Sequence, residues 1–258
     1  MTRRSAAAPL AAYLLHRYDW SESSLIVELF TRERGRVAAA AKGAKRPYSQ
    51  FRSVLLPFQR LTVLLGPQPG DDSADLHTLR GAEWAGGVPA VAGAALFRGF
   101  YMNELLLKLL ARQDPHPALF DAYAQSLPAL AGPGDGATAL RAFELLLLRE
   151  TGVLPDLSLV TQTHAPVRAE LPYGLHAEAG VIERPDDAAV PGRTLLALQQ
   201  ALGEAELAAV QRACAGALVP LRQILRAMLQ YHLGHKPLRT RQVMLELQRM
   251  IPLERETR

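Results

Sequence analysis

The sequence has almost no cysteine and no long apolar runs. Its single cysteine, Cys214, cannot form an internal disulfide and cannot supply a metal site built from several cysteines. Apolar runs are short: the leucine run at 145–148, for example, ends at Arg149, whereas a membrane-spanning helix needs roughly 20 apolar residues. We therefore expect a protein without disulfides, structural zinc or a membrane span.

Recognisable catalytic motifs are also missing. There is no His-Glu-x-x-His pair, no Walker phosphate loop and no dinucleotide fingerprint. His164 and His176 lie near each other in the sequence, but two histidines without cysteines make a weak metal-ligand set. We expect no catalytic residues, no cofactor and no metal, and we predict that the protein is not an enzyme.

The N-terminus superficially resembles a signal peptide, because Arg3 and Arg4 precede an alanine-rich stretch. His16, Arg17 and Asp19 interrupt that stretch before a full apolar region forms. We interpret it as part of the mature chain and predict a cytoplasmic location.

Positive charge is concentrated at the start of the sequence. Residues 1–65 contain eleven Lys and Arg but four Asp and Glu, a net charge of +7, and the rest of the chain carries −3. A basic surface can attract phosphates and release their counterions, although it can also serve solubility alone. Charge by itself leaves both interpretations open.

The first 85 residues have the pattern of short strands. Runs rich in β-forming residues occur at 11–16, 24–31, 58–65 and 76–84, and residues 36–41 can pair back across a turn at Gly35. Residues 43–53 and 66–73 are loops by composition. Five short strands favour a small closed barrel, of which the OB-fold is the form commonest in nucleic-acid binders.

Helical patterns dominate the rest of the chain. We predict helices at 92–112, 117–130 and 137–150, helical structure again over 194–234, and a last helix at 240–250 with Thr240 as its N-cap. Residues 161–192 form a loop-rich insert with space for a small hairpin. The predicted fold class is α+β, with an OB barrel at 1–85 and a helical domain at 86–258.

The predicted loop from Lys42 to Arg52 is the strongest candidate for a nucleic-acid site. Cations can follow phosphates while an aromatic ring stacks on a base, and Tyr48 is the candidate for stacking. A solvated loop whose Phe51 enters the barrel core is the plainer alternative. The predicted DNA-binding residues are Arg36, Lys42, Lys45, Arg46, Tyr48 and Arg52.

Two further residues have competing interpretations. Trp20 lies at the first predicted turn, where it can stack on a base, but we favour a ring that plugs the barrel end. Arg141 precedes Leu145 and Leu148 on a predicted helix, so it can grip a carboxylate above an apolar strip. The alternative is an intrahelical pair with Glu144, which the residues alone favour.

Short motifs in a fixed order resemble the RecO family. No single motif is specific, but together they cover about residues 10–245. They are Trp20–Leu25, Phe30–Thr31, Gly35–Val37, Ala41–Ala44, Leu56–Phe58, Leu79–Arg80 with Ala82–Glu83, Tyr101–Leu105, Leu140–Glu144 and Lys236–Arg241.

The resemblance implies an OB domain, a helical domain and a mediator of DNA repair and recombination. Such a protein binds single- and double-stranded DNA, anneals single strands, and works with RecR to load the recombinase RecA onto DNA covered by single-stranded DNA-binding protein. It also implies nucleoid association during repair and a pocket at Arg141, Leu145 and Leu148 for the tail of that binding protein.

The sequence departs from the family in one respect. Some relatives carry a four-cysteine zinc module where residues 161–192 lie, and this segment has no cysteine. An OB-type RNA- or DNA-binding accessory subunit without a recombination role stays open as the alternative function.

Overall fold

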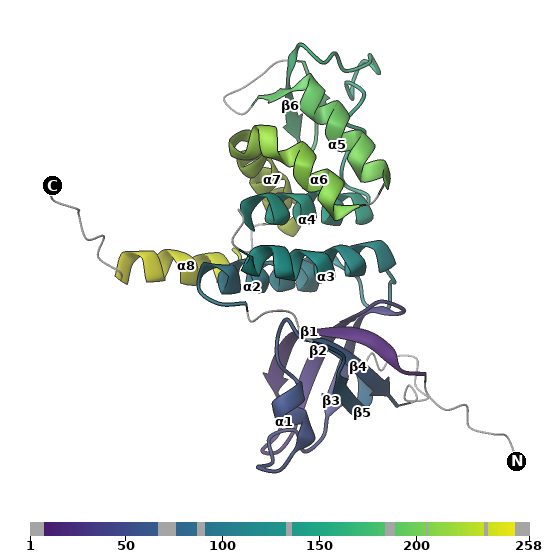
Figure 1. Ribbon diagram of the computed structural model, residues 1–258, viewed down its shortest axis with the longest axis vertical. Helices are drawn as coiled ribbons and strands as arrows, with labels where there is room; N and C mark the ends of the chain where they lie inside the picture. The colour runs from purple at the N-terminus through teal and green to yellow at the C-terminus, as the bar shows by residue number, and fades with distance from the viewer. Residues whose placement is uncertain are drawn as a thin grey trace, which may run out of the picture.

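The computed structural model describes residues 8–66, 76–86, 91–132, 136–183, 189–204, 206–234 and 237–250. Figure 1 shows a β-barrel at one end of the molecule and stacked layers of helices at the other. Arg3, Arg4, most of the predicted loop at 66–73 and Lys236 of the last motif lie outside the described residues.

The barrel confirms the predicted OB-type arrangement. Its strands follow the closed order β1-β2-β3-β5-β4, in which β3 and β5 are parallel and the other neighbours antiparallel. A short helix joins β3 to β4, as in OB-folds. The bounds are β1 Leu10–Asp19, β2 Leu25–Thr31, β3 Gly35–Ala41, α1 Gln50–Val54, β4 Arg60–Leu65 and β5 Leu76–Trp84.

Strand β4 begins two residues later than predicted. Phe58, which we placed in the strand, has a positive φ of 65° and is buried outside the barrel interior. Its ring meets Phe100 at a centroid distance of 4.9 Å. The aromatic character of Phe58 therefore serves packing against the helices rather than strand pairing.

Eight helical segments and a small sheet make up the rest of the described chain. The predicted helices at 117–130 and 137–150 are confirmed to within a residue, whereas the predicted helical stretch at 194–234 is divided into α5, α6, η1 and α7. The insert contains a three-stranded sheet of order β7-β6-β8. The bounds are α2 Ala94–Leu109, α3 Pro117–Ala131, α4 Gly136–Glu150, β6 Pro172–His176, β7 Gly180–Ile182, β8 Val190–Pro191, α5 Gly192–Glu204, α6 Leu207–Cys214, η1 Ala215–Ala217, α7 Leu218–Leu233 and α8 Arg239–Met250.

None of the helices in the described ranges combines the length and the apolar content that crossing a bilayer requires.

Aromatic side chains join the barrel to the helices. Tyr13 of β1 lies against Phe120 and Tyr123 of α3, at ring centroid distances of 5.3 and 5.0 Å, and Phe30 of β2 lies 5.4 Å from Phe120. All four rings are buried in the same core as the helices, while a second core fills the barrel interior. The predicted boundary after residue 85 stays a prediction, because the helical core includes residues from both sides of it.

Helix α8 begins at Arg239 and is capped from another helix. We predicted Thr240 as its own N-cap, but the Glu104 carboxylate of α2 accepts the backbone N–H groups of Arg239 and Thr240 at 2.8 and 2.9 Å, and the Thr240 hydroxyl at 2.7 Å. Burial raises the pKa of Glu104, but the hydrogen bonds from Thr240 and Arg239 outweigh it, so the pKa lies below its usual value. This charge also stabilises the positive end of the helix dipole.

Gly35 closes the turn between β2 and β3 where the barrel meets the helices. Its φ is 63°, and its carbonyl accepts the Thr31 hydroxyl at 2.9 Å. A Cβ at this position would lie 1.8 Å from the Asp114 carbonyl oxygen. Glycine is therefore required both by conformation and by space.

We predict that Gly35→Ala lowers the free energy of unfolding by more than about 2 kcal/mol, since it combines a strained φ with a backbone clash. Urea denaturation checks the difference. The control is Gly203→Ala in α5, where a new Cβ meets nothing within 4 Å and stability should stay the same or rise slightly. Equal stability of the Gly35 variant and the wild type would contradict the prediction.

Candidate nucleic-acid interface

The basic loop between β3 and α1 is fixed to the turn between β1 and β2. The Lys45 backbone N–H donates to the Ser23 carbonyl at 3.0 Å, and the Lys45 ammonium donates to the Ser21 carbonyl at 2.9 Å. The same ammonium lies 2.7 Å from the Asp19 carboxylate. Lys45 therefore orders the loop, and only part of its charge is available to a ligand.

An open hollow lies between this loop and the barrel, with a volume of about 610 Å³. Its wall combines cations with apolar side chains. This combination suits a single strand, because cations attract phosphates while apolar surface accepts bases. The lining residues are Arg17, Asp19, Leu25, Ala44, Lys45, Phe51, Arg52 and Leu55.

The structure places most of the predicted loop residues at this end of the barrel. Lys42, Arg46 and Arg52 are exposed, and none of them forms an ion pair within the described residues. Tyr48 is 100% exposed, so its ring is free to stack. Phe51, predicted as core, is half-buried against the barrel interior and also lines the hollow.

Sequence reasoning misjudged two residues near the hollow. Trp20 is 50% exposed in the turn after β1, so the interpretation that it plugs the barrel end is wrong. Arg17 was missed, although it is exposed on β1 and lines the hollow. The alternation of side chains along β1 places Arg17 and Asp19 on one face, and that signal could have found it.

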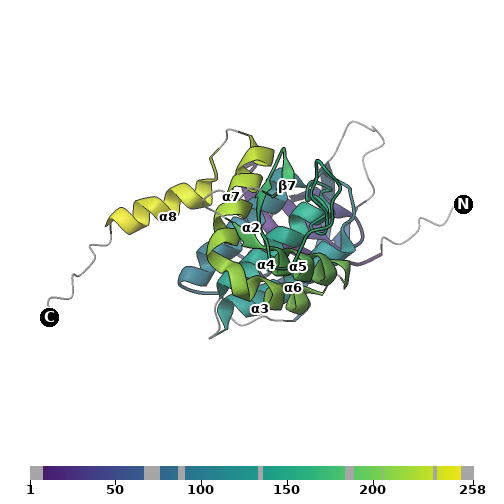
Figure 2. The same ribbon diagram turned by 90° about the horizontal axis from the view of Figure 1, so that it is seen from above.

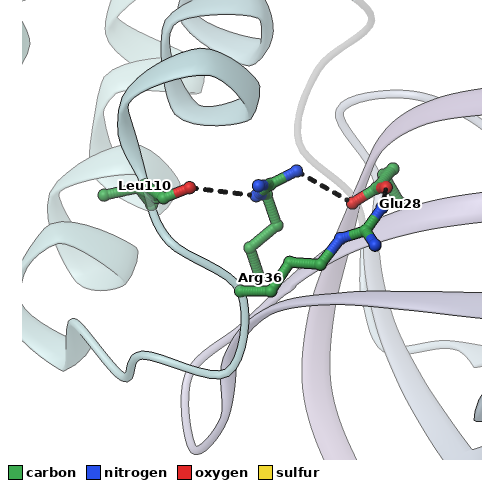
Figure 3. Close-up of polar contacts among 4 residues, drawn as sticks. Glu28, Arg36 and Leu110 are labelled. Atoms are coloured by element: carbon green, nitrogen blue, oxygen red, sulfur yellow. Dashed lines mark hydrogen bonds and ion pairs between the residues drawn. The ribbon is translucent and has the colours of Figure 1, made fainter. Parts of the chain in front are cut away.

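Arg36 is held in the contact between barrel and helices, as Figure 3 shows. Its Nε donates to the Leu110 carbonyl at 3.2 Å, and its guanidinium pairs with Glu28 at 3.3 Å. Glu28 is buried and also binds Arg112. Only 16% of the Arg36 side chain is exposed, and its guanidinium is engaged by these partners, so Arg36 has a structural role. This geometry does not support the prediction that Arg36 contacts DNA.

The second predicted site is buried rather than open. Arg141 pairs with Glu144 at 2.8 Å, so the intrahelical pair that we gave as the alternative is present. Leu145 and Leu148 are each 0% exposed, so neither lines an open slot in this structure, and the tail pocket stays a prediction. The reason is that α4 lies at the centre of the helical layers, where α3, α6 and α7 all contact it.

Glu144 lies in a buried polar cluster with Arg141 and Tyr101, whose hydroxyl donates to Glu144 at 2.8 Å. Burial raises the pKa of Glu144 to about 7, although Arg141 and the Tyr101 hydrogen bond act in the opposite direction. Burial also raises the pKa of the nearby Cys214 thiol to about 12. A protonated, buried thiol is a poor nucleophile.

No group of three His, Cys, Asp or Glu side chains in the described part of the chain could hold a metal ion.

Comparison with known proteins gives a consistent family match. Residues 9–87 match the family described as Recombination protein O N terminal, and residues 92–242 match Recombination protein O C terminal. A DNA repair protein RecO from Polaromonas sp. (strain JS666 / ATCC BAA-500) is 51% identical, covering 96% of this chain and 98% of the relative. A RecO protein from Verminephrobacter eiseniae is 52% identical, covering 92% of this chain and 95% of the relative. One from Acidovorax ebreus is also 52% identical, covering 96% of this chain and 99% of the relative.

The raised pKa of Glu144 predicts how stability depends on pH. The folded state binds this proton more tightly than the unfolded state, so the stabilisation is present below the unfolded pKa of 4.5 and is lost as pH rises towards 7. Relative to Glu144→Gln, the wild type should lose roughly 1–3 kcal/mol of unfolding free energy between pH 4.5 and pH 8. Urea denaturation of both proteins across this range measures it, and parallel pH profiles would contradict the expectation.

Proposed function

The chain belongs to the RecO family of DNA repair proteins, and from this premise we propose that it binds single-stranded DNA in the hollow of its barrel and anneals complementary strands. With RecR it loads RecA onto DNA covered by single-stranded DNA-binding protein. It acts without catalytic chemistry of its own, in the cytoplasm and on the nucleoid. The family match disfavours the alternative of an accessory subunit without a recombination role.

The observation that carries the proposal is the free end of the barrel. OB-folds bind oligonucleotides with the strand 2–3 face and the loop between strands 1 and 2. That loop carries the exposed Trp20, and the neighbouring loop carries Tyr48. Each stacked base adds about 1–3 kcal/mol, and the two rings beside the cations define the path of the bound strand.

Binding to the barrel predicts a specific salt dependence. Lys42, Arg46 and Arg52 should be changed to Gln together, leaving Lys45 in place because it orders the loop. If each cation neutralises one phosphate, the slope of log K against log salt becomes shallower by roughly 2, and affinity for a labelled oligothymidine falls. Fluorescence anisotropy over a salt series measures both.

The matched control changes three other exposed arginines, Arg34, Arg168 and Arg193, to Gln. Arg34 lies in the turn at the opposite end of the barrel strands. The control should keep the wild-type slope to within the scatter of the measurement. A wild-type slope in the loop variant would place the DNA elsewhere.

We also propose that Arg141 takes part in docking the tail of single-stranded DNA-binding protein. One support is the family resemblance. The other is a second cation near Arg141: the charges of Arg141 and of Arg241 on α8 both lower the pKa of the Tyr101 hydroxyl, so both cations lie close to it. Since Leu145 and Leu148 are covered, the terminal aromatic of the tail must be received beside α4 or after a local opening.

A labelled tail peptide ending in an aromatic residue and a free carboxylate tests this docking. Arg141→Ala should weaken binding about 10- to 150-fold through loss of a charge-assisted bond, while Arg141→Lys keeps a cation and should retain part of it. The amidated peptide is the control and should bind both variants equally weakly. Thermal melting confirms that each variant is folded. If the folded wild type and Arg141→Ala bind the free-carboxylate peptide with equal affinity, the proposal is wrong.

A further inference from the structure

The ion pair between Arg141 and Glu144 is incomplete on both sides. A guanidinium and a carboxylate can form two parallel hydrogen bonds, but here Arg141 donates from Nη2 to the Glu144 Oε1 at 2.8 Å. The Tyr101 hydroxyl donates to the same oxygen, also at 2.8 Å. Within the described residues, the buried Glu144 Oε2 and the buried Arg141 Nε have no hydrogen-bond partner. Each half of the pair therefore keeps one unused polar atom in the interior.

The acidic half of the pair is the more deeply buried. The Glu144 side chain is 1% exposed, whereas 10% of the Arg141 side chain reaches solvent. A buried charge loses its hydration, and an incomplete set of hydrogen bonds recovers little of that loss. Burial thus outweighs Arg141 and Tyr101 and raises the pKa of Glu144 to about 7. Near neutral pH this carboxyl group exists in both charged and neutral states, with Oε2 available to carry the proton.

The other helices packed on α4 bring titratable groups that stay neutral. From α6 comes the Cys214 thiol, whose pKa burial raises to about 12. From α3 comes Tyr123, whose pKa burial raises well above its usual value and whose hydroxyl donates to Asn103. The buried faces of α5 and α7 carry no ionisable side chain among the described residues. Glu144 is therefore the group in this cluster whose charge changes near pH 7.

Helix α8 brings a second cation to the same cluster. Figure 2 shows α8 projecting beyond the other helices, and its contacts with α2 place its first turns beside that helix. Burial raises the pKa of the Tyr101 hydroxyl, and the charge of the half-buried Arg241 acts against this rise, as that of Arg141 does. Two guanidinium groups thus face one carboxylate. With Glu144 neutral, an anion bound to Arg141 meets positive charge alone, whereas a charged Glu144 opposes it.

We propose that Glu144 is an internal competitor for Arg141: its carboxylate occupies the guanidinium in the free protein, and a peptide with a free C-terminal carboxylate docks there as Glu144 takes up a proton. Tyr101 can continue to donate to Oε1 while Oε2 is protonated, so the exchange needs no large movement of the Glu144 side chain. The inference rests on the tail docking proposed above and adds how that docking is regulated.

The exchange links peptide affinity to pH. The peptide carboxylate stays ionised above about pH 5, so its own titration does not interfere. If the peptide binds only to protein with neutral Glu144, a pKa of about 7 makes about one molecule in eleven competent at pH 8. Apparent affinity should then fall by the same factor relative to low pH.

The test compares the wild type with two variants of the cluster and one control. Glu144→Gln imitates the neutral acid, because its amide oxygen can accept from Arg141 and Tyr101 as Oε1 does. Tyr101→Phe removes a hydrogen bond that lowers the pKa of Glu144. The control, Glu150→Gln, removes a carboxylate from the same helix that lies 3.4 Å from His116 instead.

Fluorescence anisotropy of the labelled tail peptide from pH 5.5 to pH 8.5 gives the affinities. Calorimetry in phosphate and in Tris at pH 8 counts the protons taken up on binding, since the two buffers release protons with different heats. Thermal melting at each pH confirms folding. The effects of other titrating groups remain in Glu144→Gln, so its difference from the wild type isolates Glu144.

We expect the wild type to bind about tenfold more weakly at pH 8 than at pH 5.5 and to take up close to one proton at pH 8. Glu144→Gln should match the wild type at pH 5.5, bind about tenfold more tightly than it at pH 8, and take up no proton at this site. Tyr101→Phe should move the midpoint of the pH profile upwards. Glu150→Gln should follow the wild type.

A folded Glu144→Gln protein that binds the peptide no more tightly than the wild type at pH 8 would overturn the proposal, and weaker binding would show that Glu144 positions Arg141 instead. If Glu144→Gln does not fold, the wild type and Tyr101→Phe decide: absence of proton uptake in both overturns the proposal. Failure of the tail docking itself has a different signature. Arg141→Ala would then equal the wild type at pH 5.5, where Glu144 is neutral and does not compete.

Discussion

The packing of Tyr13 and Phe30 against Phe120 and Tyr123 determines which parts of the barrel are free. It occupies the outer side of β1 and β2, and ion pairs reinforce it: Arg32 binds Asp121 across the same contact. The turn between β2 and β3 is thereby held against the helices. The opposite end of the barrel, with Trp20, Tyr48 and the hollow, stays open. The location of the candidate DNA site thus follows from the contact that covers the other end.

One turn of α2 connects this contact to the rest of the molecule. Tyr101 donates to Glu144 of α4, Asn103 donates to the Leu14 and Leu15 carbonyls of β1, and Glu104 caps α8. Tyr123 in turn donates to Asn103 at 2.6 Å. Three neighbouring polar side chains therefore fix three separate elements. Such buried groups are expensive to leave unpaired, so each of them specifies one arrangement of its partner.

The sequence could predict what depends on local patterns and could not predict what depends on distant partners. Alternation and turn residues located all five strands, and the exposed loop with Lys42 and Tyr48 was found from composition. Arg36 is a cation near the same loop, and it was predicted as a DNA contact for that reason. Its side chain is instead bound by the carbonyl of Leu110, which is distant in the sequence, and by Glu28 on the neighbouring strand β2. The leucines after Arg141 suggested a surface strip because the covering helices were not visible in the pattern.

The barrel, α2 and α8 are held in a fixed arrangement. The aromatic contact joins the barrel to α3, the Asn103 bonds join β1 to α2, and the Glu104 cap joins α2 to α8. Each link is buried or half-buried, so β1, α2 and α8 are held together by direct contacts. Fixed placement lowers the conformational entropy that the protein itself must lose when a ligand binds. For a DNA repair protein of the RecO family, this rigidity is a contribution that the fold itself can make.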